Sequence, residues 1–139
     1  MVQLIVGKKG KGKTKQLLDK VNTEIKDAQG NVVYLDKSTK HMYELNNKIR
    51  LINVADYLIT NSDEFLGFIC GIVSQDHDLQ KMYFDSFLKI ACVEAGEIAV
   101  VIAKLEEISD KFMVDFVLSI SADEDELPEA VKSKIVISL

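Results

Sequence analysis

Proline, cysteine, histidine and arginine are scarce in this chain of 139 residues, and tryptophan is absent. The single proline and the lack of any low-complexity tract leave no flexible linker that would divide the chain. The two cysteines, Cys70 and Cys92, lie in apolar stretches without CxxC spacing, so we expect reduced core residues of a cytosolic protein. The histidines, His41 and His77, have no carboxylate or cysteine partner at ligand spacing, which argues against a metal site built from protein ligands alone.

Sequence features of membrane insertion and secretion are also missing. No apolar run approaches the length of a membrane span, and no signal peptide is recognisable before the first expected strand. The formal net charge of −5 argues against broad, non-specific binding to nucleic acid. We therefore expect a cytoplasmic protein with no membrane and no nucleic-acid partner. The length suits one α/β domain over residues 1–139 and is too short for two.

The most informative feature that is present is the segment 7–14, Gly-Lys-Lys-Gly-Lys-Gly-Lys-Thr. It matches the phosphate-binding loop pattern G-x-x-x-x-G-K-[ST] at every fixed position. An apolar run at 2–6 precedes it and a helix-period segment follows it, which is the context that the motif requires. The glycines of such a loop let the backbone turn around phosphate oxygens with its N–H groups pointing inward, at the positive end of the new helix.

The positions of this loop predict nucleotide contacts. We expect Lys13 to reach the outer phosphates and Thr14 to offer its hydroxyl to Mg²⁺. ATP is preferred over GTP because no N-K-x-D guanine motif occurs in the chain. The residues expected to contact the nucleotide are Gly7, Lys8, Lys9, Gly10, Lys11, Gly12, Lys13, Thr14 and Lys15.

Hydrophobic periodicity along the rest of the chain predicts alternating strands and helices. Five main strands are expected at 2–6, 32–35, 82–84, 114–120 and 135–137, with helices at 17–28, from 62, at 94–112 and at 126–133. Residues 42–54 are ambiguous and could form a β-hairpin at the sheet edge. Strands that alternate with helices imply a mostly parallel sheet covered on both faces, so the expected fold is a three-layer α/β domain.

Two strands of this sheet end on a carboxylate, where α/β proteins bind ligands. Asp85 follows the apolar run 82–84, the hhhD form of a second nucleotide motif whose carboxylate holds Mg²⁺ directly or through water. The alternative is a plain strand-end acid that starts a turn. Asp36 ends the strand at 32–35. The predicted metal ligands are therefore Thr14 and Asp85, and the predicted catalytic residues are Lys13, Asp36 and Asp85.

Taken together, the loop and Asp85 resemble the P-loop NTPase superfamily, over the whole chain in the order of its elements. The class of that superfamily with sheet order 5-1-4-3-2 fits the count of five strands, and the resemblance implies that order. This class usually has a glutamate directly after the magnesium aspartate, which polarises the attacking water. Here the next residue is Ser86, which argues against fast hydrolysis.

Narrower resemblances suggest more specific roles. The loop is similar to that of partition and division-site ATPases, G-K-G-G-x-G-K-[ST], although Lys9 replaces a glycine. The resemblance implies that Lys8 is the signature lysine, which in that family reaches a nucleotide in a partner subunit. It also implies that Asp36 positions water. Residues 10–14 also resemble the loop of corrinoid adenosyltransferases. Overall, the chain looks most like short stand-alone P-loop proteins often labelled twitching-motility ATPases, a label that rests on the motif alone.

Three functions remain open from the sequence. The first is an ATPase or nucleotide switch, slow or stimulated by a partner, which would be a homodimer mate or an unidentified protein. The second is a small-molecule transferase, a kinase or adenosyltransferase, whose acceptor pocket would come from residues 37–61. The third is a nucleotide sensor without catalysis. Any stabilising charge would come from Arg50, the only arginine, from Lys8 or from a partner.

Overall fold

The computed structural model describes residues 1–139 and contains one six-stranded sheet in which all neighbouring strands are parallel. The strand order is β3-β2-β4-β5-β1-β6. The strands are β1 (Val2–Gly7), β2 (Asn31–Asp36), β3 (Arg50–Asn53), β4 (Leu79–Phe84), β5 (Asp115–Ser121) and β6 (Ile135–Ser138). Because all strands run in one direction, their carboxyl ends meet along a single edge of the sheet.

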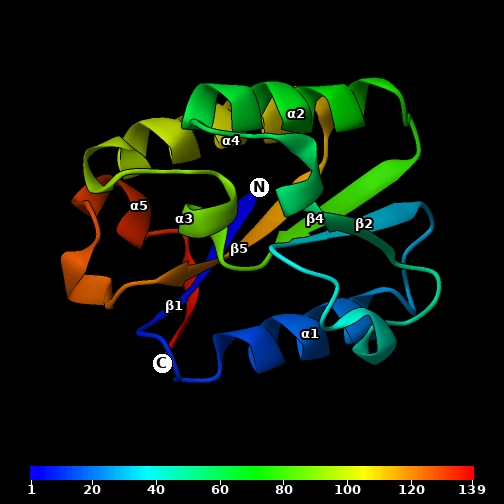
Figure 1. The fold of residues 1–139 in the computed structure, drawn as a ribbon, viewed down its shortest axis with the longest axis horizontal. Helices are drawn as coiled ribbons and strands as arrows, with labels where there is room; N and C mark the ends of the chain where they lie inside the picture. The colour runs from blue at the N-terminus through cyan, green and yellow to red at the C-terminus, as the bar shows by residue number, and fades with distance from the viewer.

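Helices cover both faces of this sheet, as expected for a parallel sheet with two apolar faces (Figure 1). They are α1 (Lys13–Glu24), α2 (Ser62–Ser74), α3 (Phe87–Ile90), α4 (Ile98–Phe112) and α5 (Glu129–Lys132). In Figure 1, α1 lies below the sheet, whereas α2 and α4 lie together above it. The predicted α/β class is confirmed. None of the helices combines the length and the apolar character that crossing a membrane requires.

The prediction of five strands is wrong, because residues 50–53 form a sixth strand outside β2. The hairpin considered for 42–54 does not form either: Met42–Glu44 is a 3₁₀ turn, and β3 runs parallel to β2. The reason is packing: Leu45 and Ile49 pack in the apolar cluster under α1. The chain therefore returns to the amino-terminal side of the sheet before β3 begins beside β2. The strand order differs accordingly, with β3 added at the β2 edge and the other five in the order β6-β1-β5-β4-β2.

Two further expectations need correction. Cys70 is exposed and Cys92 only half-buried, so neither is a core residue. Cys70 lies on the outer side of α2, whose buried residues include Ile69 and Val73. The helix expected at 94–112 begins with a separate 3₁₀ turn at Ala95–Glu97. The helix expected at 126–133 covers only Glu129–Lys132, and a separate 3₁₀ turn at Glu124–Glu126 precedes it.

An aromatic cluster fixes the end of β4 where it approaches the carboxyl edge. The fully buried ring of Phe84 packs against Phe65, Phe87 and Phe116, with centroid separations of 5.8, 6.0 and 5.5 Å. Asp85 follows directly, and its backbone N–H donates to the carbonyl of Leu35 in β2 at 2.9 Å. The position of the Asp85 carboxylate is therefore set by the core beneath it.

We expect Phe84→Ala to lower the free energy of unfolding by about 3–5 kcal/mol, because it leaves a cavity in the middle of this cluster. Urea denaturation followed by circular dichroism measures the loss. Phe112→Ala is the matched control: that ring is 48% exposed at the end of α4, and its loss should cost about 1 kcal/mol or less. Equal losses in the two variants would contradict the role given to the cluster.

Candidate functional site

The phosphate-loop segment leaves β1 at Gly7 and enters α1 at Lys13. Gly10 and Gly12 have φ angles of 87° and 92°, a left-handed conformation that glycine adopts without strain. Gly12 is also the N-cap of α1 and provides no side-chain cap. Several backbone N–H groups at this helix start consequently donate to no other backbone group: those of Gly10, Gly12, Lys13, Thr14 and Lys15. Such a run of free donors is what an anion needs.

Lys13 is held within this loop. Its side chain is largely buried, and its Nζ donates to the carbonyl oxygen of Lys8 at 3.1 Å. Burial lowers the pKa of Lys13, and the negative charge of Asp85 opposes that shift. The ammonium is thus fixed near the carboxyl edge of the sheet by the loop that it belongs to.

The other lysines of the loop differ in their surroundings. Lys9 lines the cavity described below. Lys8 does not line that cavity, and its Nζ lies 3.5 Å from a carboxylate oxygen of Asp123. Lys11 and Lys15 are exposed to solvent. The nucleotide contacts expected of these four residues stay predictions.

Asp85 is the centre of a hydrogen-bond network that joins three elements of the fold. Its Oδ1 accepts from Thr14 Oγ1 of α1 and from Ser119 Oγ of β5, each at 3.2 Å. Its Oδ2 accepts from the hydroxyl of Tyr34 in β2 at 2.9 Å. Burial, followed by the Asp85 charge, raises the pKa of Tyr34, so its hydroxyl stays a donor. Ser119 in turn accepts from the N–H of Ser86 at 2.9 Å, which orients the whole group.

Asp36 ends β2 beside this network. Its side chain is almost fully buried, at 2% exposure. Oδ1 accepts from the N–H of Lys37 at 2.7 Å, whereas Oδ2 is buried and has no hydrogen-bond partner. Burial, followed by the charge of Asp85, raises the pKa of Asp36 above its usual range. A buried carboxylate with one free oxygen is therefore available at this edge.

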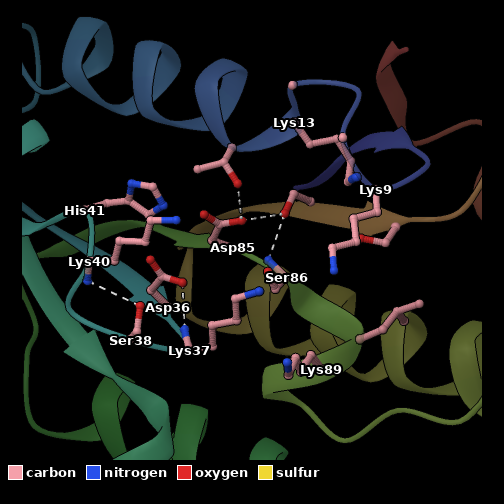
Figure 2. Close-up of a pocket in the computed structure, with 16 residues that line it drawn as sticks. Lys9, Lys13, Asp36, Lys37, Ser38, Lys40, His41, Asp85, Ser86 and Lys89 are labelled. Atoms are coloured by element: carbon pink, nitrogen blue, oxygen red, sulfur yellow. Dashed lines mark hydrogen bonds between the residues drawn. The ribbon is translucent and has the colours of Figure 1, made fainter.

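His41 joins the two aspartates, which the sequence did not predict. One ligand atom from each of Asp36, His41 and Asp85 lies within 4.8 Å of the others (Figure 2). The expectation that neither histidine has carboxylate partners is thus wrong for His41, because the loop after β2 folds back over the strand ends. His77 is exposed in the loop before β4.

These groups line a cavity of about 610 Å³ at the carboxyl edge of the sheet (Figure 2). Its walls come from the phosphate-loop segment, the chain after β2, α3 and the end of β5. Five lysines line it, Lys9, Lys13, Lys37, Lys40 and Lys89, and none forms a salt bridge with a carboxylate. The cavity therefore combines two buried carboxylates with an excess of positive charge, which suits a polyanion.

Arg50 does not contribute to this cavity within one chain. It stands at the start of β3, paired across to Val33, and so lies at the opposite edge of the sheet. Its Nη1 is 3.6 Å from a carboxylate oxygen of Asp76.

Comparison with known proteins identifies the fold. No protein-family profile and no protein of curated function matches the sequence. The flagellar accessory protein FlaH from Methanocaldococcus jannaschii matches in structure, with a TM-score of 0.61 and 15% identity over 95% of this chain and 65% of FlaH. KaiC-like protein PH0186 from Pyrococcus horikoshii OT3 matches with a TM-score of 0.65 and 17% identity, over 95% of this chain and 67% of PH0186. Both neighbours have the RecA-like P-loop fold. This chain has the RecA-like P-loop fold.

At these identities only the fold is shared, and the chain spans about two thirds of the length of each neighbour. The narrower resemblances, to partition ATPases, adenosyltransferases and twitching-motility ATPases, stay predictions.

Several residues of the site carry no motif signal in the sequence. Tyr34 is one of them. It is two positions before Asp36 in β2 and so shares a face of the sheet with it, and this spacing is a signal from which a place for Tyr34 near the site could have been inferred. His41 and the lysines of the far wall follow β2 or lie on α3, and no local pattern predicts the path of those segments.

Asp36 should make stability depend on pH. Its raised pKa means that the folded state disfavours the ionised carboxylate. The destabilisation of the folded protein by this charge is therefore absent below the ordinary carboxyl pKa of about 4. It develops as the pH rises through that value and is complete above the folded-state pKa. We expect the stability of Asp36→Asn relative to the wild type to increase as the pH rises above about 3. Urea unfolding at several pH values measures this.

The exposed Asp110 of α4 provides the control for this measurement. Asp110→Asn should show a much flatter pH dependence relative to the wild type, because water solvates that carboxylate in both states. A relative stability of Asp36→Asn that stays constant or falls with pH would refute a buried, unfavourable charge at Asp36.

Proposed function

We propose that this chain binds ATP with Mg²⁺ in the cavity at the carboxyl edge of the sheet. It would act as a slow or partner-stimulated ATPase, or as a switch driven by the bound nucleotide. The observation that most supports this proposal is the hydrogen bond between Thr14 and Asp85 next to a loop of free N–H groups. It joins a phosphate-binding element to a strand-end carboxylate, the two halves of a nucleotide site.

Phosphate binding would depend on the loop and its lysines. The free N–H groups between Gly10 and Lys15 are donors for phosphate oxygens, and the N-terminus of α1 adds its positive dipole. Lys13, already near the edge, would move its ammonium from the carbonyl of Lys8 to an outer phosphate. Lys9 supports the same role from the cavity wall.

The residues around Asp85 fit Mg²⁺. This ion prefers oxygen ligands, and the Thr14 hydroxyl and the Asp85 carboxylate offer two of them 3.2 Å apart at the cavity. Tyr34 and Ser119 would keep the carboxylate oriented. When bound, Mg²⁺ would neutralise charge on the phosphate oxygens.

Asp36 is the residue that we assign to the attacking water. Its raised pKa and unpartnered Oδ2 suit a group that accepts a hydrogen bond or a proton from water. Ser86 follows Asp85 in place of a glutamate, so Asp36 would act without a second acidic group on β4. We therefore expect slow turnover by the isolated chain, nearer the intrinsic GTPase range of about 10⁻⁴ to 10⁻² per second than the rates of kinases.

A second candidate function is a transferase that acts on a phosphate-bearing acceptor. It is favoured by Lys37, Lys40 and Lys89, which line the cavity from segments other than the phosphate loop and have no acidic partner. Product analysis separates the two functions: a hydrolase releases phosphate from ATP, whereas a transferase consumes ATP only when an acceptor is added and moves the phosphate to it.

Lys13→Ala should weaken ATP binding at least tenfold, about 1.4 kcal/mol or more, because it removes the charge that neutralises the outer phosphates. Isothermal calorimetry with ATP and Mg²⁺ measures the affinity. Lys26→Ala removes an exposed lysine just after α1 and should bind as the wild type does. Unchanged affinity in Lys13→Ala would remove the basis of the proposal.

Asp85→Asn should separate nucleotide binding from the response to Mg²⁺. In EDTA the variant should bind ATP about as well as the wild type, because the phosphate loop is intact. On addition of Mg²⁺ it should lose most of the affinity that the wild type gains, because the carboxylate charge is gone. Asp110→Asn controls for the loss of an aspartate elsewhere. A full Mg²⁺ response in Asp85→Asn would leave Asp85 as a turn residue only.

A further inference from the structure

We propose that Asp36, His41 and Asp85 form a second cation site that takes a divalent transition-metal ion such as Zn²⁺, Mn²⁺ or Co²⁺. The three residues come from the end of β2, the loop behind it and the end of β4 (Figure 2). Their ligand atoms lie within 4.8 Å of one another. Ligands of one such ion, each about 2.1 Å from it, are at most about 4.2 Å apart, so small side-chain shifts would complete the site.

The unpartnered oxygen of Asp36 is the first independent observation that supports a cation site. Its carboxylate is 98% removed from solvent, yet Oδ2 has no hydrogen-bond partner. Buried polar atoms in folded proteins are nearly always satisfied, because an unsatisfied one loses its hydration without compensation. The negative charge of the neighbouring Asp85 carboxylate adds repulsion to this lost hydration. A divalent cation between the two carboxylates would offset both the lost hydration and the repulsion.

The orientation of His41 is the second such observation. Its Nδ1 lies 2.9 Å from Oε1 of Glu44, one turn further along the loop. Histidines that bind metals almost always donate their other ring N–H to a carboxylate, a backbone carbonyl or water, which fixes the tautomer and raises the basicity of the ligating nitrogen. With Nδ1 engaged by Glu44, Nε2 is the nitrogen left for the cation. The ring is also mostly buried, with only 20% of the side chain exposed.

The donor set determines which ions are suitable. One imidazole nitrogen with two carboxylates suits Zn²⁺, Mn²⁺ or Co²⁺, whereas Mg²⁺ prefers oxygen ligands alone. The pair Thr14 and Asp85 offers only oxygen and would keep its preference for Mg²⁺. The two sites would share Asp85, whose two oxygens face different neighbours, Thr14 and Ser119 on one side and Tyr34 on the other. A cation on Asp36 would occupy the oxygen that the hydrolysis proposal assigns to water, so this site is proposed for the chain without a nucleotide.

The test is a Co²⁺ titration of the full chain without nucleotide, followed by visible absorption, which reports the ligands around that ion. The wild type should bind one Co²⁺ with a distinct spectrum. His41→Ala should bind it at least tenfold more weakly and lose that spectrum. His77→Ala removes the other histidine, which is exposed in the loop before β4, and should behave as the wild type does.

Two further readouts separate this site from surface binding. Glu44→Gln should weaken Co²⁺ binding about tenfold while keeping its spectrum, because Glu44 positions His41 without touching the ion. Zn²⁺ should raise the melting temperature of the wild type and not that of His41→Ala, since only the folded state binds the ion. If His41→Ala binds Co²⁺ with the affinity and spectrum of the wild type, the proposal is overturned. Calorimetry with ATP on the same samples tests the nucleotide proposal independently.

Discussion

The buried carboxylate of Asp85 is the point on which the rest of the site depends. It lies between a hydroxyl from α1, one from β5 and one from β2, and each of these donors is held by a different part of the fold. A carboxylate in such surroundings keeps its orientation only while all three elements keep their positions. The aromatic packing of Phe84 directly beneath it supplies that rigidity. The chemistry of the cavity is therefore coupled to the packing of the core.

The charged groups in the cavity lie close to other groups of the same sign, an arrangement that is unfavourable without a ligand. Two carboxylates are buried close together, and burial, followed by the charge of Asp85, raises the pKa of Asp36. Around them stand five lysines that form no salt bridge, in a chain whose net charge is negative. Such a site favours a ligand that brings charges of both signs, and a nucleotide with a divalent cation is one. The free N–H groups of the loop point to the same class of ligand.

The all-parallel sheet explains why residues so distant in sequence share one cavity. Each strand returns to the same edge through a crossover, so the residues that follow β1, β2, β4 and β5 meet there. The loop after β2 has a double role in this arrangement. It forms a wall of the cavity with Lys37 and Lys40, and its far end packs Leu45 and Ile49 under α1 before β3 begins.

The local features can be predicted from the sequence alone: the phosphate-loop pattern at 7–14, the strand and helix around it, and the placement of Asp36 and Asp85 at strand ends. These follow from short-range rules, because a tight turn, a hydrophobic period or a cap involves only neighbouring residues. The three-dimensional packing was needed to see that β3 joins the sheet as a parallel edge strand, that His41 and Lys89 reach the cavity, and that Tyr34 contacts Asp85. Their contacts depend on strand order and on the paths of irregular loops, and both are set by long-range packing.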